Sequence, residues 1–403
     1  MNILIVFDTD ISPSAAGGAT RMTHTLAETL SAQYGSQVSL AFFKTHKVPS
    51  PIQNKIHVTS PIEKSGFETF LLENKIDVIL VSLVIKKYLH FIPEIYKIAR
   101  KHNIKMVQWF HMMPGFEIMS YGSISRFLYA VKKRKQVIWN LKYMLMTGLG
   151  FMVRPVVTHF ILRPKYRLQY DNCDAYVLLS ENFIPDLEKM LGSKHLDKVY
   201  AINNSLTLQN TISEEALQQK QKQVLLLARQ DEPMKRISLA LRIWKKIEER
   251  NGVADWNFIV AGRGDDLDYY QYLAKKLQLK RCTIAGFLSE QPYKKSSIFM
   301  MTSAWEGWGL TLTEAQQMGV VPVAFNSYGA VYDIIQNGEN GIIVPNNDLN
   351  AFADALVSLM MNDEVRLQMA LRAVTSSNRF SLDKIACKWM DLFEHLLADT
   401  EQN

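Results

Sequence analysis

At 403 residues, with 48% hydrophobic and 21% charged residues and no low-complexity tract, the chain has the composition of an ordinary globular protein, and its length predicts two domains of roughly 200 residues. Its cysteines, Cys173, Cys282 and Cys387, have neither metal-site nor disulfide spacing, which favours a reducing compartment. The opening "MNILIVFDTD" lacks a basic n-region and reaches Asp8 at once, so it predicts a first buried strand rather than a signal peptide.

The net charge of +7 is concentrated in one segment. Between Glu117 and Asp171 there is no acidic residue, and removing the basic residues of this interval leaves about −3 for the rest of the chain. Those ten residues are Arg126, Lys132, Lys133, Arg134, Lys135, Lys142, Arg154, Arg163, Lys165 and Arg167.

Strand-like runs rich in Val and Ile alternate with helical patterns in both halves of the chain, which predicts βαβ units and parallel sheets. In the first half the expected elements are strand 2–7, helix 18–34, strands 37–43 and 77–83, helix 91–102 and strand 104–110. In the second half they are strand 223–228, helix 235–250, strand 256–262, helix 268–279, strands 282–287 and 297–303, helix 310–319, strand 320–325, helix 330–337 and strand 341–345.

This order predicts an α/β protein with two Rossmann-like domains whose parallel sheets face one another across a cleft, joined near 199–207. The expected parts are an N-terminal acceptor-binding domain over 1–200, a donor-binding domain over 201–380 and an amphipathic helix over 381–403. This helix is expected to cross back to the first domain, with packing on the second domain as the alternative. The basic and aromatic stretch at about 120–167 breaks the alternation and is interpreted as an insertion. In such sheets ligands bind beyond the carboxyl ends of the strands.

The stretch "SAWEGWGLTLTEAQQMG" (303–319) follows a predicted strand in this way. Gly307 and Gly309 allow close approach to a ligand, and a helix beginning near Leu310 presents N–H groups suited to a phosphate. Glu306 and Glu314 would then accept hydrogen bonds from hydroxyl groups attached to that phosphate. The alternative is an ordinary strand-to-helix turn with Glu314 on a solvated helix face.

Two cations follow the first strand of the second half, in "LLLARQDEPMKR". Arg229 offers a planar fork and Lys235 a mobile point charge, so together they could neutralise a diphosphate without a metal. The alternative is a pair of solvated surface cations.

These segments, with "FIVAGRGDD", "CTIAGFLSEQ" and "DIIQNGENGIIVPNND", occur in the order seen in retaining GT-B glycosyltransferases of family 4, which the chain resembles over roughly 199–380. The resemblance implies that Arg229 and Lys235 grip the donor diphosphate, that Glu306 meets hydroxyls of the transferred sugar and that Glu314 binds the nucleotide ribose. It also implies donor contacts from Gly262 and Gly264, from Gly286 and Phe287 near the base, and from Gly307, Trp308, Gly309 and Leu310, with no metal ion. For Trp308, as for Trp305, core packing is an equal alternative to stacking on the ligand.

The first domain resembles the family less. "SAAGGATR" matches the family's N-terminal glycine loop beneath the donor phosphates through Gly17 and Gly18, with a plain tight turn as the alternative. Arg21 could reach the acceptor or a phosphate. His111 ends a strand, and family members often have a histidine near this point that contacts the donor sugar or supports the leaving group.

The basic insertion has several interpretations. Lys132, Lys133, Arg134 and Lys135 among aromatic residues favour contact with an anionic membrane surface. The alternatives are a basic face that grips an anionic acceptor or is simply solvated, a transmembrane helix over 143–162, and a nucleic-acid surface, which is disfavoured because no recognisable module is present.

The predicted function is a retaining hexosyltransferase that moves a sugar from a nucleotide sugar, with UDP the commonest family donor base, to a glycan or lipid-linked acceptor in cell-surface polysaccharide or glycolipid synthesis. The predicted location is cytoplasmic, peripheral at the inner face of the cell membrane. A GT-B-like binding protein without transferase activity and a GT-B epimerase remain alternatives. A dinucleotide-cofactor protein is disfavoured because no G-x-G-x-x-G follows the first strand, and a phosphorylase because no pyridoxal-phosphate lysine site is found.

Overall fold

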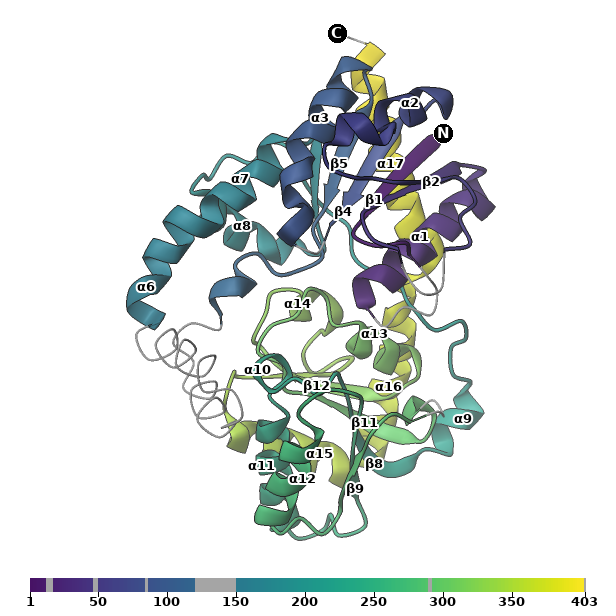
Figure 1. Ribbon diagram of the computed structural model, residues 1–403. Helices are drawn as coiled ribbons and strands as arrows, with labels where there is room; N and C mark the ends of the chain where they lie inside the picture. Colours follow the sequence, from purple (N-terminus) through teal and green to yellow (C-terminus); the bar gives the residue numbers. More distant parts are fainter. Residues whose placement is uncertain (12–16, 46–49, 84–85, 120–149, 289–291, 402–403) are drawn as a thin grey trace. The chain divides into compact units, whose positions relative to one another are not determined.

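The computed structural model describes residues 1–11, 17–45, 50–83, 86–119, 150–288 and 292–401 (Figure 1). The chain divides into two compact units. Unit 1 comprises Met1–Gly115, Pro155–Ser205 and Phe380–Asn403, and unit 2 comprises Phe116–Arg154 and Leu206–Arg379.

Unit 1 is built on a seven-stranded parallel sheet in the order β3-β2-β1-β4-β5-β6-β7. Alternate residues of its central strands, such as Leu4 and Val6, face one buried core because successive side chains of a strand point to opposite sides. In sheet order the strands are Lys55–His57, Gln37–Phe42, Asn2–Phe7, Val78–Ser82, Lys105–Trp109, Ala175–Leu178 and Val199–Ala201.

Seven helices belong wholly or partly to unit 1 in the described part of the chain. They are α1 (Gly18–Tyr34), α2 (Phe67–Glu73), α3 (Ile92–Lys101), α6 (Gly150–Val157), α7 (Arg163–Asp171), α8 (Ile184–Leu191) and α17 (Leu382–Glu401). The terminal helix α17 packs beside α1 (Figure 1). The buried ring of Trp389 meets Trp109 edge-on, with the ring centres 4.9 Å apart. This contact fixes the end of the chain to the strand that precedes His111.

A π-helical turn, Thr158–Leu162, joins α6 to α7. Leu162 and Tyr166 point inward, whereas Val156, Phe160 and Ile161 are exposed by 54%, 70% and 49%. Among the described residues, no helix is long and apolar enough to cross a bilayer. Of the basic insertion expected at about 120–167, the described residues are 150–167.

Unit 2 is built on a six-stranded parallel sheet in the order β10-β9-β8-β11-β12-β13. Val224 and Leu226 of β8 face a core shared with Trp244 of α11, and Leu225 between them points to the other side. The strands, again in sheet order, are Cys282–Ala285, Asn257–Ala261, Gln221–Leu227, Ser296–Met301, Val321–Phe325 and Ile342–Val344.

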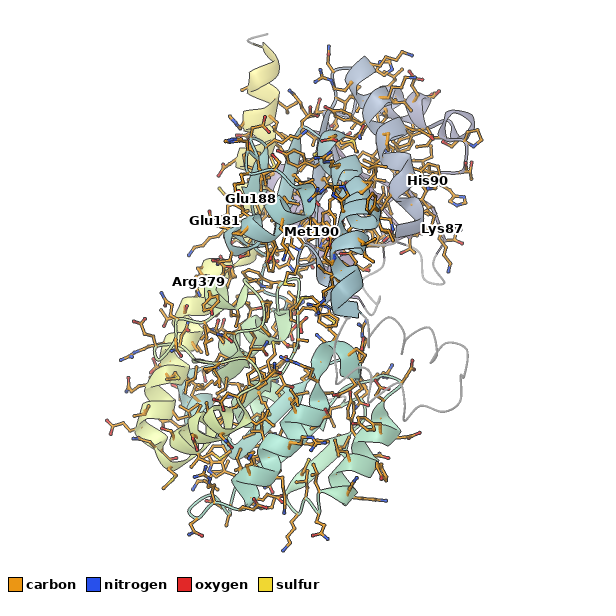
Figure 2. The ribbon with its side chains drawn as sticks, turned by 90° about the vertical axis from the view of Figure 1, so that its left-hand side faces the viewer. Lys87, His90, Glu181, Glu188, Met190 and Arg379 are labelled. Atoms are coloured by element: carbon orange, nitrogen blue, oxygen red, sulfur yellow. The ribbon has the colours of Figure 1, made fainter. Side chains whose placement is uncertain are left out.

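In unit 2, α11 packs against α12 and α15, and α16 packs against α9, α13 and α15 (Figure 1). Arg379, labelled in Figure 2, is the last residue of the unit and donates from Nη2 to the carbonyl of Ile334 at 2.9 Å. The helices of unit 2 are α9 (Glu214–Gln218), α10 (Glu232–Lys235), α11 (Ile237–Glu248), α12 (Leu267–Lys276), α13 (Leu310–Gln317), α14 (Val331–Ile334), α15 (Leu349–Met361) and α16 (Asp363–Ser377).

The expected fold class, α/β with two parallel sheets, is therefore confirmed. Two expected helices differ in detail. Helix 235–250 is two helices, α10 and α11, separated by Arg236 in the left-handed conformation with φ 47°. Helix 330–337 is the single turn Val331–Ile334, after which Ile335 is extended.

Replacing Gly262 by Ala should destabilise unit 2 by about 2–4 kcal/mol. Gly262 has φ 144°, and a Cβ there would lie 1.8 Å from the carbonyl oxygen of Ala228, a backbone atom that cannot move aside. Chemical denaturation measures the change. Gly286→Ala is the matched control because, among the described residues other than its chain neighbours, no atom lies within 4 Å of its Cβ position. An equal loss in both variants would contradict the steric argument.

Candidate active site

In unit 2, strands β8 and β11 are neighbours, and the chain leaves them toward opposite edges of the sheet. This is the point at which the strand order reverses, where open α/β sheets bind their ligands. Lys235 lies in the segment after β8, and Glu306 lies in the segment after β11. The topology therefore brings together two residues that are 71 positions apart.

Lys235 and Glu306 form an ion pair between Nζ and Oε1. Their side chains are only 15% and 8% exposed. The same carboxylate oxygen accepts a hydrogen bond from Ser303 Oγ at 2.6 Å. A buried ion pair is stable only when further hydrogen bonds satisfy it, and Ser303 supplies one of them.

The glycine turn after Glu306 is constrained by its neighbours. Gly309 has φ 106°, and a Cβ at this position would lie 2.6 Å from the hydroxyl of Tyr328. Burial, and then the nearby charge of Glu306, raises the pKa of the Tyr328 hydroxyl well above its ordinary value. Trp305 and Trp308 are 7% and 2% exposed, so both indoles pack inside the unit. This burial agrees with core packing, the alternative to stacking on a ligand.

The second glutamate has different partners. Glu314 accepts hydrogen bonds from Thr207 Oγ1 at 2.5 Å and from Tyr293 Oη at 2.8 Å, one on each carboxylate oxygen. It is buried on α13 rather than solvated. Each carboxylate oxygen therefore accepts a hydrogen bond from a hydroxyl group of the protein.

The loops after β8, β9 and β10 are joined by backbone hydrogen bonds. Gln230 N donates to Arg263 O at 2.8 Å, and Gly262 N donates to Gly286 O at 2.9 Å. The Arg263 guanidinium lies 4.1 Å from the ring centre of Phe287, whose side chain is 64% exposed.

Arg229 and Gly264 belong to the same edge. Arg229 is 66% exposed and pairs with Asp231 at 3.0 Å. Gly264 packs so closely on the backbone of Gln230 that a Cβ would lie 2.2 Å from that carbonyl oxygen. The carboxyl edge of unit 2 thus carries an exposed arginine, a buried lysine and a carboxylate, which together suit a phosphorylated, hydroxyl-rich ligand.

In unit 1, His111 follows β5 and is 8% exposed. Its Nε2 shares a hydrogen bond of 2.6 Å with Ser82 Oγ at the end of β4, and Ser82 Oγ lies 3.1 Å from Thr23 Oγ1 on α1. Nδ1 of His111 is buried and has no hydrogen-bond partner among the described residues. Burial lowers the pKa of His111 from 6.5 to about 3, so the imidazole is neutral.

The remaining predicted positions lie in the first half of the chain. Gly17 is the N-cap of α1, which begins at Gly18, and Arg21 lies exposed in the first turn. Lys132, Lys133, Arg134 and Lys135 fall outside the described residues. Among the residues that are described, no group of three or more His, Cys, Asp and Glu side chains is placed to hold a metal ion.

Several residues at these positions escaped the sequence analysis. Thr207 and Tyr293 hold Glu314, Ser82 and Thr23 hold His111, and Arg236 follows Lys235 directly. Hydroxyl partners carry no sequence signal of their own. The sequence shows that Arg236 follows Lys235, but it does not indicate whether this arginine is buried or lies on the surface.

Residues 209–374 match the model of the family "Glycosyl transferases group 1". The chain is 26% identical over 231 residues to an uncharacterized glycosyltransferase of Haemophilus influenzae, a match that covers 55% of this chain and 62% of that protein. It is 32% identical over 156 residues to the lipopolysaccharide core biosynthesis mannosyltransferase LpsB of Rhizobium meliloti, covering 36% of this chain and 44% of LpsB. Both matches thus span less than two thirds of the curated relative.

The fold of the whole chain is that of the Anabaena protein Alr3699/HepE, solved in complex with UDP. The TM-score is 0.69 at 14% sequence identity, and the superposition covers 98% of this chain and all of the other. The architecture is therefore GT-B.

His111 should remain neutral from about pH 8 to about pH 5, because burial disfavours its charged form. An imidazole NMR titration measures this: one histidine signal, absent from His111→Gln, should not shift over this range. Between pH 6.5 and about 3 the unfolded chain binds a proton here that the folded chain does not. This residue therefore makes stability fall with decreasing pH, by at most about 1.4 kcal/mol per unit. If the signal that disappears in His111→Gln titrates near the ordinary histidine pKa in the wild-type protein, His111 is not held neutral by burial.

Proposed function

Through residues 209–374 the chain belongs to the glycosyl transferases group 1 family, and from this premise we propose that it transfers a hexosyl residue from a nucleotide sugar, a UDP-sugar first, to a glycan or lipid-linked acceptor with retention of anomeric configuration. The observation that carries the proposal is the ion pair of Lys235 and Glu306 at the strand-order reversal of unit 2. The UDP in the Alr3699/HepE complex supports the choice of donor base.

The two cations take the donor diphosphate. Lys235 is fixed by Glu306, whereas Arg229 is 66% exposed and its partner Asp231 lies on the same loop, so its guanidinium can move to a phosphate. Both cations stabilise the negative charge that develops on the departing nucleoside diphosphate. Stabilising the charge that develops in the transition state is what accelerates the transfer. The backbone from Gly307 to Leu310 lies beside Glu306 and contacts phosphate and sugar.

The two glutamates hold the donor by its hydroxyl groups. Glu306 accepts hydrogen bonds from the transferred sugar, and Glu314 accepts them from the ribose in place of Thr207 or Tyr293. Neither carboxylate works as the acid or base of a glycosidase pair: one is neutralised by Lys235, and the other has both oxygens bound by hydroxyls. The departing diphosphate takes the acceptor's proton, and the protein acts by positioning.

Further donor contacts come from the loops after β9 and β10. Gly262 and Gly264 keep the edge of the sheet open, and Gly286 with the exposed ring of Phe287 lies on the side assigned to the base. In unit 1, Gly17 and Gly18 open α1 toward a phosphate, and Arg21 and neutral His111 serve the acceptor and the transferred sugar.

The acceptor side is assigned to a lipid surface. Val156, Phe160 and Ile161 are exposed next to the basic residues Arg163 and Lys165, at the end of a segment without acidic residues. Apolar side chains beside unopposed cations suit the headgroup region of an anionic bilayer. The enzyme would act peripherally at the cytoplasmic face of the membrane on a lipid-linked glycan. The lipopolysaccharide function of LpsB agrees with this assignment.

One nucleotide sugar should bind with micromolar affinity and be consumed, and Glu306→Ala should weaken binding and lower kcat by about 10²–10³-fold, because the variant loses the sugar contact and frees Lys235. Calorimetry with UDP-, GDP- and ADP-sugars measures the first effect, and nucleoside diphosphate release in the presence of acceptor lipids measures the second. Glu339→Ala, an exposed glutamate of the same unit, is the control. The product anomer, read by ¹H NMR, tests retention. Binding of no nucleotide sugar would refute the proposal.

Charge reversal of Lys132–Lys135 should abolish binding to phosphatidylglycerol vesicles, since each basic residue contributes about 1 kcal/mol at an anionic surface. Phe160→Asp should weaken binding as well. Tyr272→Asp, which alters a 55% exposed aromatic residue of unit 2, should not. Vesicle flotation measures all three, with phosphatidylcholine vesicles as the uncharged comparison. Unchanged flotation of the charge-reversed protein would remove the membrane assignment and leave the transferase proposal intact.

A further inference from the structure

Arg236 occupies an unfavourable position. It connects α10 to α11 with φ 47°, a backbone conformation that glycine adopts readily and side chains rarely do. The residue is 7% exposed, and burial lowers the pKa of its guanidinium to about 10. Backbone strain and a buried cation at one residue persist only where the surrounding structure compensates for them.

The compensation comes from four hydrogen bonds and one ring. Nε donates to the carbonyl of Thr302 at 2.8 Å, and Nη2 donates to the carbonyl of Ser303 at 2.7 Å. Nη1 reaches Asn347 Oδ1 at 2.7 Å, and Nη2 also reaches Asn346 Oδ1 at 2.9 Å. The guanidinium lies 5.3 Å from the ring centre of Phe325. Arg236 therefore joins the segments that follow β8, β11 and β13.

Both members of the ion pair depend on these segments. Ser303, whose carbonyl Arg236 holds, donates its hydroxyl to Glu306. In the opposite direction, Thr302 Oγ1 donates to the carbonyl of Lys235 at 2.9 Å. The planar fork of Arg236 thus fixes the β11 exit against the α10–α11 corner, which carries Lys235 one residue earlier.

We propose that Arg236 is the positioning residue of this site: its guanidinium sets the distance between Lys235 and Glu306, and with it the geometry in which the donor diphosphate and sugar are held. The inference rests on the proposed function for its kinetic consequence, but not for its structural one. Displacement of catalytic groups by about 1 Å can lower a rate about a hundredfold.

The test compares Arg236→Gly, Arg236→Lys and Arg281→Gly. Glycine suits the backbone at position 236, so the first variant removes the guanidinium without adding strain. Arg281 is the matched control because it makes similar contacts: its Nη1 donates to the carbonyl of Trp256 at 2.9 Å, and its guanidinium lies 5.7 Å from the centre of the Trp244 ring. It differs in position, since it precedes β10 and so lies at the amino end of a strand, whereas Arg236 lies beyond the carboxyl end of β8. Thermal unfolding corrects each variant for its folded fraction.

Two readouts separate positioning from general stability. In Arg236→Gly, kcat should fall about a hundredfold with a smaller change in the donor KM, and millimolar guanidinium should restore part of the rate, as should Arg236→Lys. The amine of Lys235 should also react at least about threefold faster with limiting acetic anhydride, followed by mass spectrometry, because it is no longer held by Glu306. Arg281→Gly should change neither quantity per folded molecule.

Unchanged kcat and unchanged Lys235 reactivity in Arg236→Gly would overturn the inference while leaving the transferase proposal standing. A wild-type protein inactive with every nucleotide sugar would overturn the proposed function instead. In that case the Lys235 reactivity still decides the inference: faster acetylation in Arg236→Gly alone supports it, and equal reactivity rejects it.

Discussion

The ion pair between Lys235 and Glu306 constrains the segments at the carboxyl edge of the unit 2 sheet. It joins the chain leaving β8 to the chain leaving β11, the two strands at which the sheet order reverses. Because both charges are largely removed from water, their surroundings must supply hydrogen bonds. Ser303 meets this need at the carboxylate, and the carbonyl of Lys235 is held by Thr302.

The two glutamates show how environment divides the roles of one residue type. Glu306 and Glu314 stand eight positions apart, yet the first faces a cation and the second faces two hydroxyl groups. A carboxylate beside a fixed cation contributes to an electrostatic site. A carboxylate among hydroxyls is already engaged in the kind of contact that a ribose offers, so a bound ribose can replace one hydroxyl by another without exposing an unsatisfied charge.

Most strands and their parallel arrangement could be predicted because apolar runs bounded by polar residues have few other uses in a chain of this length, but the short strands β3, β6 and β7 were not among the expected elements. The strand-end rule, together with the family resemblance, then selected Arg229, Lys235, Glu306 and His111 as candidate site residues. The break at Arg236 could not be predicted, since a left-handed corner is normally announced by glycine. Nor could Thr207 be paired with Glu314, because their contact spans 107 residues and depends on how the interdomain segment lies along α13.

The two units place chemically different groups at the strand-order reversals of their sheets. At the strand-order reversal of unit 1, the chain from Thr23 through Ser82 to His111 is uncharged, and burial keeps the imidazole neutral. At the corresponding place in unit 2 the groups are ionic and shielded from water. A neutral imidazole can form hydrogen bonds with hydroxyl groups without attracting an anion, whereas a buried lysine presents a positive charge that attracts phosphate groups. The low pKa of His111 therefore keeps its imidazole uncharged, because burial removes the charge of a lone histidine. In unit 2 burial instead requires that the lysine be paired with a carboxylate, so burial decides the chemistry at the strand-order reversal of each unit.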